Sequence, residues 1–335
     1  MKTTTATSRR FPDRRVSVAP MMGWTDRHDR YFMRLITPHA LLYTVMITTG
    51  ALTYGKKFEV LDFSEQEHPL ALQLGGSDPA EMAACTKLAK QWGYDEVNIN
   101  CGCPSERVQR GAFGACLMAE PALVADGVKA MVDAVSLPVT VKHRIGIDKN
   151  EDYGFVRDFV GTVSEAGCAV FMVHARNAWL QGLSPKENRE IPPLRYDLVH
   201  QLKRDRPDLT IEINGGLETL GDCLSQLQVV DGAMVGRAAY HHPLRWAGVD
   251  HDVFNDSSAV KAKASTVVRG LMTYADNWRR RGDRLWPIAR HLVHVVEGVA
   301  GARAWRQQLT QAAGQRDAGA EVLDAAARQL EAHGY

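Results

Sequence analysis

The sequence predicts an α/β protein, a (β/α)₈ TIM barrel followed by a small C-terminal bundle of helices. Eight short, apolar, β-rich runs recur as far as Val235, and helix-length amphipathic segments alternate with them. After about Asn255 only helical patterns remain. Strict alternation of strands and helices is typical of a parallel sheet, and eight such strands close into a barrel. A doubly wound open sheet is the alternative.

The expected strands are short and rich in branched apolar residues. They cover 16–19, 42–46, 70–74, 96–100, 139–142, 170–174, 210–214 and 232–235. Helices are expected between them, with proline or polar residues at their starts, at 79–92, 121–135, 153–166 and 194–206. The C-terminal helices are expected at 259–281, 286–299, 303–310 and 318–333.

Three regions follow from this pattern: a flexible basic tail (1–15), the barrel as catalytic domain (16–250) and the helical domain (255–335). A chain of 335 residues with 45% hydrophobic content can bury one large core and carry a small appendage. It has no apolar run long enough to cross a membrane and no secretory signal, so we expect a cytoplasmic protein.

Charge is distributed unevenly along the chain. The net charge is only +1, yet residues 279–306 contain seven arginines and two acidic residues. Such a run forms either a solvated helix face or a local binding patch for a polyanion. Six cysteines show no disulfide pattern, and the spacing of Cys101, Cys103 and Cys116 fits no common zinc site, so we expect reduced thiols and no metal.

The residues that follow the expected strands are mostly polar or glycine, and strand ends are where barrel enzymes carry their active sites. They are Pro20, Met21, Met22, Gln73, Asn98, Asn100, Cys103, Lys142, Arg144, His174, Arg176, Asn214, Gly215, Gly216, Gly236 and Arg237. The glycines after the last two strands allow backbone N–H groups to approach a phosphate, although ordinary turns explain them too. Gln73 and His174 are weak signals when taken singly, because a packed amide or histidine is also common.

Lys142 ends an otherwise apolar strand, so its ammonium is expected at the barrel mouth opposite an anionic partner. A reduced flavin, which is negatively charged near its N1 and O2 atoms, is one such partner. A Schiff-base lysine of a barrel aldolase is the rival. Cys103 lies in a sharp Gly-Cys-Pro turn, and its protonated thiol could donate a proton.

Several motifs resemble the tRNA-dihydrouridine synthases. They are APMMGWTD (19–26), NINCGCPS (98–105), GAFGACL (111–117), VKHR (141–144), VHAR (173–176), INGG (213–216) and VGR (235–237). The segments 176–189 and 301–306 are similar to the A subgroup, which modifies uridines 20 and 20a of the D-loop. Cys101 departs from the apolar residue usual in relatives, and we expect it to add sensitivity to oxidation.

The resemblance implies a reaction and a cofactor. It implies that the protein reduces the 5,6 double bond of uridine in tRNA, with NADPH reducing a tightly bound FMN, hydride passing from FMN to carbon 6 and Cys103 protonating carbon 5. It implies an FMN site formed by Pro20, Met21, Met22, Gln73, Lys142, His174, Asn214, Gly215, Gly216, Gly236 and Arg237. The barrel is then the FMN-binding domain, and a monomer is expected.

The partner implied is tRNA, whose loop nucleotides are easier to extrude than paired ones. We expect RNA contacts from Asn100, Arg144, Arg176, Lys186, Arg189, Arg303 and Arg306, with the helical region 255–335 as the tRNA-binding domain. Trp286 and Trp305 beside the arginines favour this interpretation. The rivals are a flavin barrel that reduces a free pyrimidine or an enone, and an idle RNA-binding barrel without cofactor.

Overall fold

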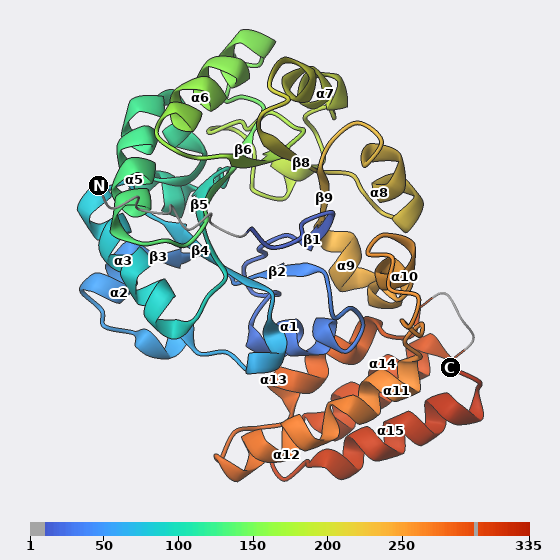
Figure 1. Ribbon diagram of the computed structural model, residues 1–335. Helices are drawn as coiled ribbons and strands as arrows, with labels where there is room; N and C mark the ends of the chain where they lie inside the picture. The colour runs from blue at the N-terminus through green and yellow to red at the C-terminus, as the bar shows by residue number, and fades with distance from the viewer. Residues whose placement is uncertain (1–10, 298–300) are drawn as a thin grey trace, which may run out of the picture.

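Eight parallel strands form a closed ring at the centre of the molecule (Figure 1). The computed structural model describes residues 11–297 and 301–335. The barrel strands are β1 (Val16–Val18), β2 (Leu41–Tyr43), β4 (Leu70–Gly75), β5 (Glu96–Cys101), β6 (Val139–Arg144), β7 (Val170–His174), β8 (Thr210–Asn214) and β9 (Gly232–Val235). Because β1 pairs with both β2 and β9, and β2 also pairs with β4, the ring is closed. The predicted TIM barrel is confirmed.

The predicted strand 42–46 is interrupted. Its first part is β2, and a two-residue strand, β3 (Ile47–Thr48), pairs with the upper end of β4. Between them, the backbone N–H of Gln73 donates to the hydroxyl of Thr44 over 3.1 Å. A side chain therefore replaces a backbone carbonyl as acceptor, and the sheet ladder stops there.

Helices surround the ring and connect its strands. They are α1 (Arg27–Arg34), α2 (Thr49–Thr53), α3 (Pro79–Trp92), α4 (Glu106–Arg110), α5 (Pro121–Ala134), α6 (Tyr153–Glu165), α7 (Tyr196–Asp205), α8 (Leu220–Gln226), α9 (Arg237–His241) and α10 (Val249–Asp252). Local chemistry sets the ends of α3: Asp78 accepts the N–H of Glu81, proline starts the first turn, and Gly93 ends the helix in the left-handed region.

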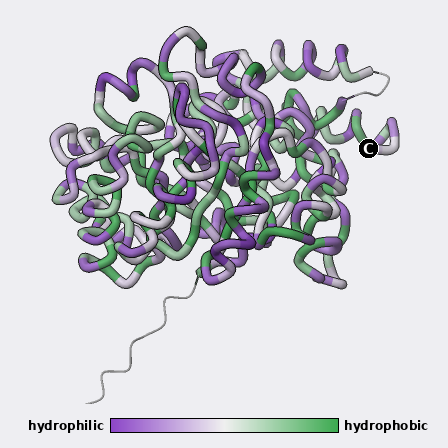
Figure 2. Tube along the Cα trace, turned by 90° about the horizontal axis from the view of Figure 1, so that it is seen from above, coloured by the Kyte–Doolittle hydropathy of each residue, from purple (hydrophilic) through white to green (hydrophobic). Residues whose placement is uncertain are grey.

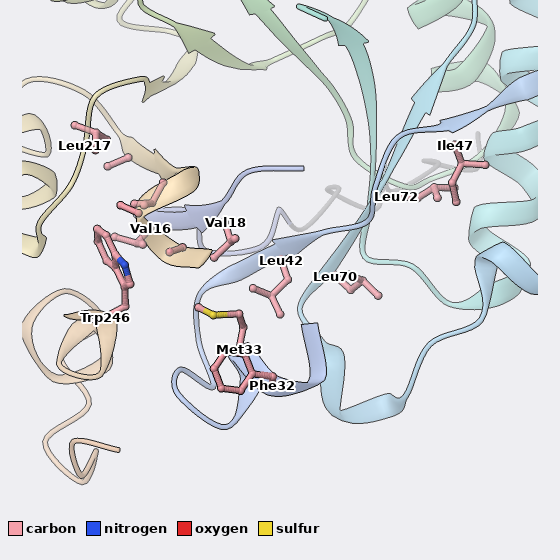
Figure 3. Close-up of a cluster of buried hydrophobic side chains, with 14 of the residues drawn as sticks. Val16, Val18, Phe32, Met33, Leu42, Ile47, Leu70, Leu72, Leu217 and Trp246 are labelled. Carbon is pink, nitrogen blue, oxygen red and sulfur yellow. The ribbon is translucent and has the colours of Figure 1, made fainter. Parts of the chain in front are cut away.

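Apolar side chains of the strands pack outward against these helices. Figure 3 shows Phe32 and Met33 of α1 beside Leu42, and all three are at most 1% exposed. In Figure 2 the hydrophobic stretches lie mostly within the barrel body, while hydrophilic ones predominate in the outer loops. Burial of this layer of apolar side chains is the main favourable contribution to folding.

The inside of the barrel is polar near its N-terminal end. Glu96 and Glu212 are fully buried there, and Arg14 pairs with Glu96 and lies 3.9 Å from Glu212. Burial raises the pKa of Glu212 to about 7. Of the predicted flexible tail 1–15, residues 1–10 lie outside the described residues, whereas Arg14 is packed into the barrel floor at 5% exposure.

The C-terminal helices form a layer beside α1 and α10 (Figure 1). They are α11 (Ala264–Gly270), α12 (Met272–Arg280), α13 (Trp286–Ala289), the 3₁₀-helix η6 (Arg290–His294), α14 (Ala302–Ala313) and α15 (Ala320–Ala332). The helix predicted at 259–281 begins later and divides at Leu271, and the one predicted at 286–299 is shorter, with residues 298–300 outside the described part. Among the described residues, no helix is long and apolar enough to cross a membrane.

Candidate active site

A cavity of about 980 Å³ opens at the C-terminal ends of the barrel strands. All eleven residues expected to bind the cofactor line it: Pro20, Met21, Met22, Gln73, Lys142, His174, Asn214, Gly215, Gly216, Gly236 and Arg237. The cavity is also lined by Cys103, Asn100, Arg144 and Arg189. Arg176, Lys186, Arg303 and Arg306 do not line it. The closed ring brings these side chains together, because all parallel strands end at the same edge.

The loop after β5 holds Cys103 in the cavity wall. Asn100 Oδ1 accepts hydrogen bonds from the backbone N–H groups of Gly102 (3.1 Å) and Cys103 (3.0 Å). The carbonyl of Cys103 accepts from the backbone of Ala115 at 2.9 Å. The Cys103 thiol is partly exposed and lies 3.6 Å from the hydroxyl of Ser105. A thiol is thus presented to the cavity on a tightly held backbone.

Cys101 lies two residues earlier and is fully buried. Burial raises the pKa of its thiol well above the usual range. Oxidation requires access and thiolate character, so the expected sensitivity to oxidation at Cys101 is wrong: the side chain packs in the core.

Lys142 places a cation in the cavity. Its Nζ donates to Asn214 Oδ1 over 3.1 Å, and the other end of that amide donates to the carbonyl of Met234 over 2.7 Å. Burial, assisted by the nearby charge of Arg144, lowers the pKa of Lys142 to about 8. The ammonium therefore faces a neutral amide rather than a carboxylate, and its charge remains available to an anionic ligand.

Arg144 lines the cavity and also binds the backbone of neighbouring loops. It is 4% exposed and donates to the backbone carbonyls of Gly102, Asn177 and Asn188 at 2.8–3.1 Å. Burial lowers the pKa of its guanidinium to about 10. Sequence reasoning placed Arg144 among the RNA contacts and did not identify these carbonyl partners, because they lie 33 to 44 positions away along the chain.

His174 presents a buried nitrogen that no protein group satisfies. Its Nδ1 has no hydrogen-bond partner within the described chain. Burial and the surrounding cations hold its pKa well below the usual range, so the ring is neutral. A buried polar atom without a partner is costly, so this nitrogen is suited to a bound molecule.

The turn after β8 requires glycine. Gly215 and Gly216 have φ values of +110° and +73°, and a Cβ on Gly216 would meet Leu194 Cδ1 at 2.5 Å. Tyr196 OH donates to the carbonyl of Gly215 over 2.6 Å and fixes the turn. The backbone is therefore held in a left-handed conformation at the cavity wall.

The remaining cationic side chains differ in their hydrogen-bond partners and exposure. Arg237 forms an exposed ion pair with Glu190 at 2.8 Å. Arg176 donates to the carbonyl of Pro192, and Lys186 is exposed next to a proline of the cavity wall. On α14, Arg303 is exposed and Arg306 is partly buried.

Trp305, taken in the sequence as one sign of RNA binding near the arginines, is buried and gives no such support. Trp305 is 3% exposed, and its Nε1 donates to the carbonyl of Leu292 over 3.1 Å. It packs inside the bundle because it occupies the apolar face of α14. Trp286, by contrast, is partly exposed.

The loop after β1 connects the cavity to the helical bundle, and sequence reasoning missed this link. Trp24 lines the cavity and stacks on Tyr240 at 4.7 Å. Arg290 of η6 donates to the carbonyl of Gly23 over 3.0 Å and pairs with Asp26, which His291 also approaches. Two histidines after Arg237, His241 and His242, also line the cavity and were not predicted.

Residues 11–297 and 301–335 contain no cluster of three or more His, Cys, Asp or Glu side chains that could hold a metal ion. Cys101, Cys103 and Cys116 are free thiols.

Comparison with known proteins identifies relatives along nearly the whole chain. A protein from Shewanella oneidensis named tRNA-dihydrouridine(20/20a) synthase is 53% identical over 319 residues and covers 95% of both chains. Proteins of the same name from Escherichia coli K12 and Pseudomonas putida are each 55% identical, covering 92% and 91% of this chain and 90% of their own. A solved 2-naphthoyl-CoA reductase complex shares the fold, with a TM-score of 0.55 at 10% identity over 70% of this chain and 49% of its own.

The family model described as dihydrouridine synthase matches residues 17–331, which include the barrel, the cavity and the helical bundle. This chain therefore belongs to the dihydrouridine synthase family.

Proposed function

We propose that this protein reduces the 5,6 double bond of uridines 20 and 20a in the D-loop of tRNA to dihydrouridine, with bound FMN and with NADPH as reductant. One observation carries the proposal: a thiol, a lysine ammonium, an unsatisfied histidine nitrogen and a glycine turn converge on one cavity. The names of the closely similar relatives point to the same reaction.

The cavity residues fit FMN. Its phosphate would be held at the Gly215–Gly216 turn and near Gly236 and Arg237, where the backbone can approach an anion and a cation is at hand. The ring would lie against Pro20, Met21, Met22, Gln73, Lys142, His174 and Asn214. The unsatisfied Nδ1 of His174 and the ammonium of Lys142 have no carboxylate partner and suit its polar edge. When bound and reduced, this cofactor supplies hydride.

Cys103 is the proposed proton donor. Its thiol lies on the cavity wall, and the backbone hydrogen bonds from Gly102 and Cys103 to Asn100 fix its approach. After the proton has moved to carbon 5 of uracil, the thiolate is left among the positive charges of Lys142 and Arg144, which electrostatically couple to it. Asn100, Arg144 and Arg189 would contact the uridine within the cavity.

We propose further that residues 255–335 bind tRNA outside the cavity, with Arg303 and Arg306 on α14, and that Arg176 and Lys186 contact the RNA near the mouth. Arg303 and Lys186 are exposed and free to reach phosphates. A monomer acting in the cytoplasm completes the proposal, and light scattering of the purified protein tests its oligomeric state.

The test is dihydrouridine formation in unmodified tRNA incubated with the purified protein and NADPH, with the modified positions mapped. We expect product at positions 20 and 20a, and a loss of at least about a hundredfold in rate for Cys103→Ala. Cys116→Ala is the matched control, because Cys116 is also a partly exposed thiol but does not line the cavity. Bound, reducible flavin without tRNA product would favour reduction of a small molecule instead.

A further inference from the structure

A chain of hydrogen bonds runs inside the barrel upward from Glu96. Thr140 Oγ1 donates to Glu96 Oε1 over 2.6 Å, and Asn98 Nδ2 donates to Thr140 Oγ1 over 2.9 Å. Gln73 Nε2 then donates to Asn98 Oδ1 over 2.7 Å. These four side chains are at most 1% exposed.

The chain ends at the backbone that carries the proposed proton donor. Asn100 Nδ2 donates to Gln73 Oε1 over 2.9 Å. The oxygen of the same amide accepts from the backbone N–H groups of Gly102 and Cys103. A hydrogen-bonded series of five side chains thus begins at the Glu96 carboxylate in the lower barrel and ends at Asn100, which holds the Cys103 loop.

Strand register explains why these side chains meet. Gln73 of β4 lies opposite Asn98 of β5, which lies opposite Thr140 of β6. Because side chains alternate along a strand, Glu96, Asn98 and Asn100 all point to the same face of β5. The chain therefore crosses β4, β5 and β6 on the inner face of the barrel.

Glu96 determines which group donates and which accepts in every hydrogen bond of the chain. A carboxylate only accepts, so the proton of Thr140 points to Glu96 and the lone pairs of its oxygen remain for Asn98. Asn98 then offers its oxygen to Gln73, and Gln73 offers its oxygen to Asn100. If one amide were reversed, two N–H groups or two oxygens would face each other in a buried site, which is costly.

We propose that Glu96, Thr140 and Asn98 are positioning residues for the reaction proposed above: they set the amide orientations of Gln73 and Asn100 and thereby hold the Cys103 loop. The inference rests on the proposed function for its catalytic consequence. Its physical content, a loop held by a buried polar chain, stands on the geometry alone.

Thr140→Val tests the chain, because valine has the shape of threonine without the hydroxyl. Asn98 Nδ2 loses its oxygen acceptor and keeps only the weak acceptor Met172 Sδ at 3.5 Å, so its amide and the two beyond it become free to reverse. We expect hydrogen exchange of the Gly102 and Cys103 amides, measured by mass spectrometry on the protein as purified, to accelerate about tenfold. Thr140→Ser restores the hydroxyl and is expected to exchange like the wild type.

Tyr43→Phe is the matched control. Tyr43 is also fully buried, and its hydroxyl donates to the same Glu96 oxygen at 2.9 Å, but no link of the chain passes through it. We expect its loss to leave exchange at Gly102 and Cys103 unchanged, even where it lowers the melting temperature. Asn98→Leu breaks the chain at the next link and replaces Thr140→Val should that variant not fold.

Kinetics add a second readout. With saturating tRNA we expect kcat of Thr140→Val to fall about tenfold while KM for tRNA is unchanged, because the substituted side chain is buried and does not line the cavity. Unchanged exchange in both broken-chain variants, equal acceleration in Tyr43→Phe, or acceleration spread evenly over the barrel would each overturn the inference. A wild type that forms no dihydrouridine would refute the proposed function instead. The exchange comparison would still show whether the buried hydrogen bonds hold the Cys103 loop.

Discussion

Replacing Asp26 with asparagine should loosen the link between the helical bundle and the cavity while leaving α1 capped. One oxygen of Asp26 accepts the backbone N–H groups of His28 and Asp29 at the start of α1. The other oxygen, Oδ2, accepts from Arg290 at 2.5 Å, and Nε2 of His291 lies 3.1 Å from the capping oxygen Oδ1. Asparagine is an equally good N-cap, so its oxygen can keep the cap, while its NH₂ group replaces the oxygen that accepts from Arg290. The substitution therefore removes the negative charge and this hydrogen bond together.

The size of the effect follows from the exposure of the pair. Asp26 and Arg290 are 32% and 31% exposed, so solvent screens part of their attraction. A charge-assisted hydrogen bond in this setting contributes about 1–2 kcal/mol to the free energy of unfolding. Although burial opposes it, the nearby His291 ring and the hydrogen bonds that Asp26 accepts from the backbone of Asp29 and from Arg290 hold the pKa of Asp26 well below its usual value. The stabilisation is therefore complete above about pH 4 and is lost on further acidification.

Urea unfolding at pH 7 and steady-state kinetics with tRNA measure the two consequences. We expect Asp26→Asn to lose about 1–2 kcal/mol of stability and about tenfold in kcat/KM, because Arg290 no longer fixes the loop that carries Met21, Met22 and Trp24. Asp324→Asn is the control, since Asp324 pairs with Arg269 within the bundle and touches no cavity loop. Equal kcat/KM for both variants and the wild type would refute the reasoning.

Three further predictions concern the cavity. Because burial lowers the pKa of Lys142 to about 8, its charge is lost as the pH rises through 8, and the affinity of the apo-protein for FMN, measured by fluorescence titration, should fall above pH 8 in the wild type but not in Lys142→Met. Gly216→Ala should lower the free energy of unfolding by about 1–2 kcal/mol, because alanine is strained at this left-handed φ and its Cβ would meet Leu194. Gly161→Ala should raise the free energy of unfolding by up to about 1 kcal/mol, because Gly161 lies in α6 with open space around it. A destabilised Gly161→Ala would contradict this contrast. Iodoacetamide should alkylate Cys103 and spare the buried Cys101, as peptide mapping will show, and modification of Cys101 in the folded protein would count against the core packing described.

Positions at strand ends could be predicted from the sequence because barrel geometry alone sends them to one edge. Gln73, Lys142, His174 and Gly216 lie on one wall as expected, although they are far apart in the chain. No contact between particular side chains was needed for that inference. The periodicity of apolar residues was sufficient, together with the rule that parallel strands end at a common edge.

Contacts between side chains and distant backbone could not be predicted in this way. Arg144 binds three backbone carbonyls, and Arg237 pairs with Glu190. Both sets of contacts depend on how loops fold over one another. The interruption at Thr44 likewise depends on one hydroxyl finding the N–H of Gln73. The burial of Trp305 likewise depends on which face of α14 packs against the core, and its position beside arginines in the sequence does not reveal this.

The two ends of the barrel interior are electrostatically linked through Glu212, whose charge interacts with those of both Arg14 and Lys142. Glu212 lies two residues before Asn214 on β8, but it forms no ion pair with Lys142. Instead Glu212 binds the hydroxyl of Ser17 and lies beside Arg14, which also pairs with Glu96. Lys142 donates its hydrogen bond to the neutral amide of Asn214 and feels the charge of Glu212 only from a distance. Because an ammonium without a carboxylate partner interacts more strongly with a bound anion, the segment before β1 contributes to the charge of a cavity at the opposite end of the barrel.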